Sequence, residues 1–217
     1  MLLVGNGRLI TRDEAFPYAE DGAVALDGEV IKEVGALSEL RAKYPDAEFV
    51  DARGGVIMPG LINVHTHIYS GLARGLSIDG FNPTNFLEVL DGQWWYIDRH
   101  LTLDGTRACA YATVLDCIRD GVTTIFDHHA SFCEIPGSLF AIKDVCQELG
   151  IRANLCYEVS ERDGAEKCGQ AIRENADFAR GAKEQDDDMI KAMFGGHALF
   201  TISDKTFEKM VKANDGM

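Results

Sequence analysis

The sequence has no apolar run that approaches the roughly 20 residues of a membrane-spanning helix. Its first apolar stretch, Met1-Leu-Leu-Val-Gly5, is too short for a signal peptide and lacks a basic start. We therefore expect no membrane partner and no export, and we assign the protein to the cytoplasm.

Cys-x-x-Cys pairs are also absent, although the chain contains six cysteines. In a chain without an export signal, scattered cysteines are typically reduced and mostly buried thiols. The sequence predicts this state for all of them: Cys109, Cys117, Cys133, Cys146, Cys156 and Cys168.

Positive charge is scarce, with 21 Lys and Arg against 35 Asp and Glu, which gives a formal net charge of −14. So acidic a chain repels phosphate backbones, and we expect no nucleic-acid partner. The composition is otherwise that of a globular protein, with 46% hydrophobic and 26% charged residues.

The chain is also too short for a complete barrel of strand–helix units. Alternating strand and helix patterns begin at about residue 56, which indicates a parallel sheet. A complete barrel of eight strand–helix units takes about 250 residues or more, whereas residues 56–217 hold about four such units. We therefore predict an α/β fold, the N-terminal half of a (β/α)8 TIM-like barrel. We expect such a half to form a homo-oligomer or to pair with a complementary C-terminal half, because its edge strands are open.

Residues 1–55 form short β segments and turns instead. Leu2–Val4 and Arg8–Thr11 are two brief strands, and Ala23–Val34 is a hairpin around Asp27-Gly28. A helix over Ser38–Tyr44 and a strand over Ala47–Asp51 follow. We expect this region to be part of a small β-sandwich, as the family resemblance described below implies.

The pattern from residue 56 predicts particular strands and helices. The helical stretches and the later strands alternate along the chain: helical at 84–120, strand at 123–129, helix at 136–149, strand at 152–159, helix at 165–183, strand at 189–194, and a last helix capped by Ser203.

The first barrel strand, Leu61–His67, carries two histidines on a predicted common face. His65 and His67 are two residues apart, so in a strand their rings project from the same side. Two neutral imidazoles there can converge on one metal ion. Asn63 is expected on that face, and Ile62, Val64 and Thr66 are expected to be buried under helices.

Other polar residues fall at the ends of the later strands, where barrel active sites lie. The second strand ends with Asp127, His128 and His129, and His197 follows the fourth. The third ends with Tyr157-Glu158, a weaker signal. Five of the six histidines therefore lie at one predicted rim, and the sixth, His100, is expected to be structural.

These motifs resemble those of one enzyme family. The chain is similar to the amidohydrolase superfamily and, within it, to the deaminase/chlorohydrolase branch and the selenium-metabolism-associated aminohydrolases of the SsnA type. The resemblance is carried by Pro59-Gly-Leu-Ile-Asn-Val-His-Thr-His67, Tyr69-Ser-Gly-Leu-Ala-Arg-Gly-Leu76, Thr123-Thr-Ile-Phe-Asp-His-His-Ala130 and Gly196-His-Ala-Leu-Phe-Thr-Ile-Ser203.

The resemblance implies one divalent metal, Zn²⁺ or alternatively Fe²⁺, with His65 and His67 as ligands. Binuclear members bridge two metals through a lysine near the end of the fourth strand, and Lys191 is too far upstream for that role. The remaining ligands and the proton-shuttling Glu come from the fifth and eighth strands in the family. We expect that neither Glu158 nor Glu161 replaces them.

The resemblance also implies substrate contacts. His197 matches a catalytic histidine that contacts the substrate, and Asp127-His128-His129 resembles a motif that lines the substrate pocket. Adjacent strand residues point to opposite faces, so at most one of the two histidines faces the pocket, and we favour His128. Trp94 either packs between helices or forms a pocket wall over a flat ring.

The function implied is that of a metal-dependent aminohydrolase. Metal-activated water would attack a C–N or C–Cl bond of a small heterocyclic substrate. The alternatives are a binuclear cyclic-amide hydrolase and a non-catalytic half-barrel that serves in assembly.

Overall fold

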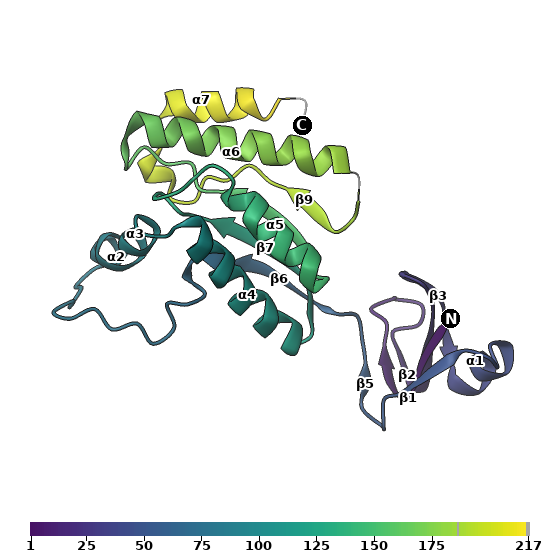
Figure 1. Ribbon diagram of the computed structural model, residues 1–217. Coiled ribbons are helices and arrows are strands. Elements are labelled where there is room, and N and C mark those ends of the chain that lie inside the picture. The colour runs from purple at the N-terminus through teal and green to yellow at the C-terminus, as the bar shows by residue number, and fades with distance from the viewer. Residues whose placement is uncertain (186, 216–217) are drawn as a thin grey trace. The chain divides into compact units, whose positions relative to one another are not determined.

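The computed structural model describes residues 1–185 and 187–215, and the chain divides into two compact units, Met1–Gly60 and Leu61–Met217. Within the described ranges, no helix is long and apolar enough to cross a membrane. Figure 1 labels helices and strands of each unit.

The first unit is a five-stranded sheet with one helix. Its sheet has the order β3-β2-β1-β4, with β5 also paired to β1. The predicted segments Leu2–Val4 and Arg8–Thr11 are one continuous strand, because β1 absorbs the irregular stretch in between as register shifts. The elements are β1 (Leu2–Ile10), β2 (Tyr18–Asp27), β3 (Val30–Ala36), α1 (Leu37–Lys43), β4 (Glu48–Asp51) and β5 (Val56–Ile57).

The predicted hairpin around Asp27-Gly28 is present between β2 and β3. Asp27 pairs with Val30, and Gly28 has a φ of +60°, a conformation that glycine adopts without steric cost. The small core of this unit consists of Leu3, Ala23, Ala25 and Leu40.

The second unit is a four-stranded parallel sheet in the order β6-β7-β8-β9. Helices α4, α5 and α6 follow one another over one side of it (Figure 1). The α/β class and the succession of parallel strands predicted from the sequence are confirmed. The strands are β6 (Leu61–Thr66), β7 (Val122–His129), β8 (Arg152–Tyr157) and β9 (Ile190–Ala192).

The helices of this unit differ from the predicted ranges mainly at their ends. The helical region after the first strand is divided, because a non-helical stretch separates α3 from α4. Its pieces are η1 (Ile68–Ser70), α2 (Phe86–Val89), the π-helical η2 (Leu90–Trp94), α3 (Trp95–Asp98) and α4 (Leu103–Arg119). The later helices are α5 (Ser138–Leu149), α6 (Gly164–Gln185), η3 (Leu199–Thr201) and α7 (Asp204–Ala213).

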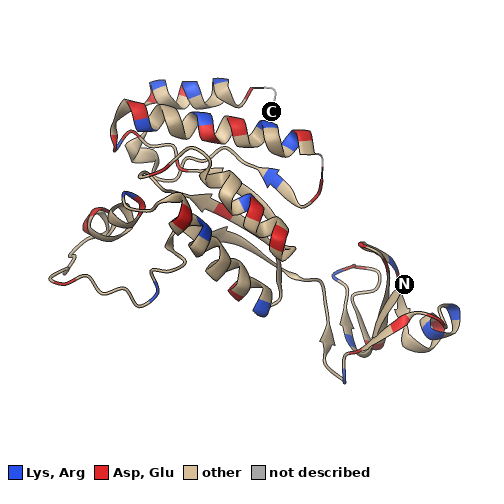
Figure 2. Cartoon of the chain, viewed as in Figure 1, with Lys and Arg blue, Asp and Glu red and all other residues tan. Residues whose placement is uncertain are grey.

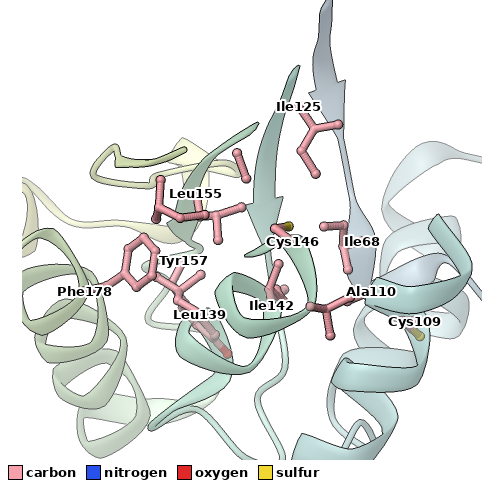
Figure 3. Close-up of a cluster of buried hydrophobic side chains, with 14 of the residues drawn as sticks. Ile68, Cys109, Ala110, Ile125, Leu139, Ile142, Cys146, Leu155, Tyr157 and Phe178 are labelled. Carbon is pink, nitrogen blue, oxygen red and sulfur yellow. The ribbon is translucent and has the colours of Figure 1, made fainter. Parts of the chain in front are cut away.

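The core of this unit lies between the sheet and helices α4, α5 and α6. Ile125 and Leu155 project from β7 and β8, and both are fully buried. They face Ala110, Ile142 and neighbouring helix residues (Figure 3). Charged residues are instead spread along α6 and α7 (Figure 2). The alternation of apolar and polar side chains therefore fixes which faces of these elements pack inward.

The orientation predicted for β6 is wrong in part. Ile62 and Val64 are 60% and 72% exposed instead of buried under helices, whereas Thr66 is buried. Asn63 lies beside Cys117 of α4, on the helix side of the sheet. The cause is an irregular register with β7 between Asn63 and Thr66, the interval that contains His65, so the faces of Ile62 and Asn63 do not carry over to the histidines by simple alternation.

Candidate metal and substrate site

Parallel strands bring their carboxyl ends to one edge, and polar residues of all four strands gather there. His65 lies on β6 and His67 directly follows it, and His128 lies near the end of β7. Glu158 directly follows β8, and His197 follows β9. Ring centroids of His67 and His197 are 4.9 Å apart, and those of His128 and His197 are 4.8 Å apart.

The two histidines of the first strand have a geometry that suits a shared metal. Their Nε2 atoms are 3.0 Å apart. His67 Nδ1 lies 3.0 Å from the carbonyl oxygen of His128, and since a carbonyl can only accept, Nδ1 carries the hydrogen and donates it. Nε2 of His67 then has a free lone pair. Two ligands of one tetrahedral zinc are about 3.3 Å apart, so this pair fits the ion closely.

His128 is a desolvated imidazole without hydrogen-bond partners. Both of its ring nitrogens are buried, and neither has a partner. Burial, followed by the neighbouring His197 and His67, lowers the pKa of His128 to about 3. The ring is therefore neutral at pH 7 and has a lone pair available to a ligand.

Glu158 is a site residue that the sequence indicates only weakly. It is 4% exposed, and its Oε2 lies 3.9 Å from Nδ1 of His197. Together with His128 and His197 it forms a group whose potential ligand atoms all lie within 4.8 Å of one another. The expectation that Glu158 does not replace the ligands of the fifth and eighth strands stays a prediction, because this group does not include His65 or His67. The position of Glu158 one residue after the third strand was the available signal.

A buried arginine supports Glu158 from behind. Arg162 donates to both carboxylate oxygens of Asp98, at 3.2 and 2.5 Å, and its Nε lies 3.4 Å from Oε1 of Glu158. Its guanidinium lies between the rings of Trp95 and Phe132, at 5.0 and 3.9 Å. This arrangement joins the helical segment before α4 to the loop after β8.

Burial dominates the ionisation of the two carboxyl groups in this network. It raises the pKa of Asp98 to about 7, even though Arg162 favours the charged form. Burial likewise raises the pKa of Glu158, and Arg162 opposes this shift too.

A cavity of about 290 Å³ opens beside the histidines. Aromatic and apolar side chains line it together with polar and charged ones. The lining residues are His65, His67, Tyr69, Ser70, Phe86, Leu90, Trp94, Trp95, Glu158 and His197. Of the two possibilities for Trp94, this placement favours the pocket wall.

Asp127 and His129 lie on the opposite side of β7 from His128. Both are fully buried and neither lines the cavity. Asp127 accepts a hydrogen bond of 2.7 Å from the backbone N–H of Ile68, and burial raises its pKa to about 8. His129 packs against Tyr69 and Tyr157. The geometry therefore does not support direct substrate contact by these two residues, and it gives Asp127 the role of fixing the chain after His67.

Asn175 of α6 holds the ends of two strands together. Its Oδ1 accepts hydrogen bonds from the backbone N–H groups of Tyr157 and Gly195, at 2.9 and 3.2 Å. Its Nδ2 donates to the carbonyls of Tyr157 and Ala171. A side chain at Gly195 would place its Cβ 2.2 Å from the carbonyl oxygen of Tyr157, so only glycine fits there. This contact fixes the positions of Glu158 and His197.

Lys191 and His100 lie outside the cavity. Lys191 Nζ donates to the carbonyl of Asp187 at 2.8 Å and pairs with Asp188, before the strand reaches the rim. His100 is exposed, and its Nδ1 lies 2.7 Å from the carbonyl of Tyr96. Neither residue is placed to bridge or bind a metal at the histidine cluster.

Comparisons with known proteins show what this chain is similar to. Residues 56–216 match the amidohydrolase family, and residues 22–47 match the imidazolonepropionase-like composite domain of bacteria. The chain is 29% identical over 209 residues to a 5'-deoxyadenosine deaminase of Methanosarcina barkeri, an alignment that covers 96% of this chain and 45% of that protein. It is 30% identical over 204 residues to a 5-methylthioadenosine/S-adenosylhomocysteine deaminase of Thermococcus onnurineus, covering 93% and 44%.

A solved structure supports the fold. The zinc complex of atrazine chlorohydrolase TrzN from Arthrobacter aurescens has a TM-score of 0.76 to this chain at 23% identity, covering 98% of this chain and 50% of that one. The chain thus spans about half the length of the proteins that it matches. The narrower assignment to the SsnA type stays a prediction. The family match covers most of the chain, and this protein belongs to the amidohydrolase family.

Proposed function

We propose that this chain supplies the N-terminal half of the active site of a metal-dependent aminohydrolase. The observation that carries the proposal is the pair of Nε2 atoms of His65 and His67, 3.0 Å apart at the wall of an aromatic-lined cavity. The proposed ion is one divalent metal, zinc before iron, since two imidazole ligands suit both and the matching TrzN structure is a zinc complex.

The residues of this chain have separate roles in binding the metal and the substrate. His65 and His67 would hold the metal, which when bound supplies the Lewis acidity that activates water at neutral pH. The carbonyl of His128 fixes the His67 ring by accepting its Nδ1 hydrogen. His197 lines the cavity, and burial lowers its pKa, so it offers a neutral imidazole that can donate to or accept from a substrate. His128 packs behind His197 and does not itself line the cavity. Trp94 and Trp95 provide flat faces for a ring to stack on.

The proposed substrate is a small nitrogen heterocycle that loses an amino group as ammonia. The two deaminase relatives act, by their names, on adenosine derivatives, which favours a purine over other rings. Loss of chloride is the second candidate, because the matching TrzN is an atrazine chlorohydrolase. A binuclear cyclic-amide hydrolase is disfavoured, because Lys191 is held away from the cavity.

The test is a product assay with added Zn²⁺ on the 217-residue chain and on any longer product of its reading frame. Ammonia and chloride are measured with 5'-deoxyadenosine, methylthioadenosine, guanine and a chlorotriazine. We expect ammonia release by a longer product, and its loss after His65→Ala with His67→Ala. His100→Ala is the matched control and should keep full turnover. If neither product forms with any substrate while zinc is bound, the chain is a non-catalytic half-barrel instead.

A cytoplasmic location and association with a second copy or a complementary half stay predictions.

A further inference from the structure

We propose that His128, Glu158 and His197 form a second site for a divalent transition-metal cation, separate from the His65–His67 pair. Their potential ligand atoms all lie within 4.8 Å of one another. This inference goes beyond the proposed function, which assigns the metal to the other two histidines.

The ligand set matches a known preference. Two imidazoles and one carboxylate hold Zn²⁺ in several hydrolytic enzymes and leave coordination positions open. Three atoms no more than 4.8 Å apart lie within about 2.8 Å of a common centre, against about 2.0–2.2 Å in a zinc site. Each atom therefore moves by less than about 1 Å to bind, which side-chain rotation allows.

The unpaired state of His128 is the second, independent observation. Neither of its ring nitrogens has a hydrogen-bond partner, and both are shielded from solvent. Leaving a buried polar group unpaired costs about 1–3 kcal/mol. A bound cation would give one of these nitrogens a strong partner. Binding would therefore offset the free-energy cost of leaving that nitrogen unpaired.

Glu158 is oriented for this role by its two oxygens facing different groups. Oε1 faces Nε of Arg162 at 3.4 Å, while Oε2 faces Nδ1 of His197 at 3.9 Å. A carboxylate ligand whose second oxygen meets a buried donor is the usual supporting arrangement of a metal site. Arg162 is itself fixed by Asp98 and by the rings of Trp95 and Phe132, so the carboxylate is held before the cation arrives.

The cation also has an entry path. The His197 side chain is 43% exposed, although that of Glu158 is only 5% exposed. His197 is the residue placed against substrate in the proposed function, so a cation in this site and a substrate would compete for it.

The test measures Zn²⁺ binding to the 217-residue chain by equilibrium dialysis and elemental analysis. The reference is a variant with His65→Ala and His67→Ala, in which only the second site is left. We expect this variant to keep one zinc per chain. In that background, Glu158→Gln, which is nearly isosteric, and His197→Ala should each weaken binding by more than about 100-fold, because even supporting residues of metal sites cost roughly 10–100-fold. His100→Ala is the matched control and should leave the affinity unchanged.

A second measurement needs no substitution at the site. Ring-nitrogen NMR resonances of the unsubstituted chain are followed as Zn²⁺ is added, and those of His128 and His197 should shift. The inference is overturned if zinc disappears in the His65→Ala, His67→Ala variant, or if only the His65 and His67 resonances move. Those outcomes would leave the metal assignment of the proposed function intact. If the chain binds a single zinc that is lost on substitution of Glu158 or His197 but kept in the His65→Ala, His67→Ala variant, this site is supported and the metal assignment of His65 and His67 is contradicted.

Discussion

At the scale of single residues, Asn175 fixes the backbone that carries Glu158 and His197. It is fully buried and makes four hydrogen bonds to backbone groups of Tyr157, Ala171 and Gly195. No other side chain type of this size could satisfy two N–H donors and two carbonyl acceptors at once.

Asn175→Ala should therefore lower the free energy of unfolding by about 2–4 kcal/mol, since each buried backbone group left unpaired costs about 1–3 kcal/mol. Urea denaturation measures the loss. Arg173→Ala, an exposed change on the same helix, is the control and should stay within about 0.5 kcal/mol. Equal effects of the two variants would show that the contact is not stabilising.

Asp98 gives the protein a specific dependence on pH. Its pKa is raised by burial to about 7 in the folded protein, so the folded state keeps a proton that the unfolded chain has already released. The stability contributed by Asp98 is complete below about pH 4 and is lost as the pH rises through about 7.

The Asp98→Asn variant has no titrating group at this position, so it does not lose this stability as the pH rises. The free energy of unfolding of the variant, relative to that of the unsubstituted chain, should therefore increase between pH 5 and pH 8. Urea denaturation at four pH values in this range checks the trend. Asp177→Asn, which removes an exposed carboxylate from α6, is the control for the loss of one negative charge and is measured at the same pH values. If the Asp98→Asn curve runs parallel to that of the unsubstituted chain, the proton is not held by Asp98.

At the scale of elements, helix α5 depends on a carboxylate from α6. Glu174 is 4% exposed and accepts hydrogen bonds from the N–H groups of Gly137 and Leu139, at 2.8 and 2.9 Å. Gly137 is the N-cap of α5 and has a φ of +87°. As a glycine it has no side chain that could accept a hydrogen bond from these N–H groups. The helix start is thus completed by a residue distant in the sequence.

Glu174→Ala should destabilise the protein by about 2 kcal/mol, the upper end of what a lost helix cap costs. Thermal unfolding followed by circular dichroism measures the change. Glu208→Ala, an exposed glutamate on α7, is the control and should have a small effect. A similar loss in both variants would contradict the capping role.

At the scale of the whole molecule, strand β6 presents an open apolar surface. Leu61, Ile62 and Val64 are 47%, 60% and 72% exposed. In the described part of the chain, β6 pairs only with β7, so its other edge offers unpaired backbone groups. Such an edge is a template for association with another chain.

We expect the 217-residue chain to self-associate for this reason. Static light scattering should give a mass above that of one chain, and Ile62→Glu with Val64→Glu should lower it. Val211→Glu, at an exposed valine on α7, is the control and should leave the mass unchanged. A monodisperse monomer before any substitution would contradict the prediction.

The sequence by itself determined the order and type of most elements of the second unit. Strand and helix periodicities are local, so the ranges near 123–129, 152–159 and 165–183 could be read from residue spacing alone. The gathering of His65, His67, His128 and His197 could be predicted as well, because parallel strands bring their carboxyl ends to one edge.

Only the tertiary structure decided which side chains meet. Glu158 and Arg162 are ordinary charged residues in the sequence, and their place beside His197 depends on contacts with Asp98, Trp95 and Phe132. The exposure of Ile62 and Val64 follows from a register irregularity, which depends on the neighbouring strand β7 as much as on β6 itself. Local spacing fixes the face a residue takes within a regular element, whereas burial and pairing between distant segments come from packing, which no single stretch of sequence encodes.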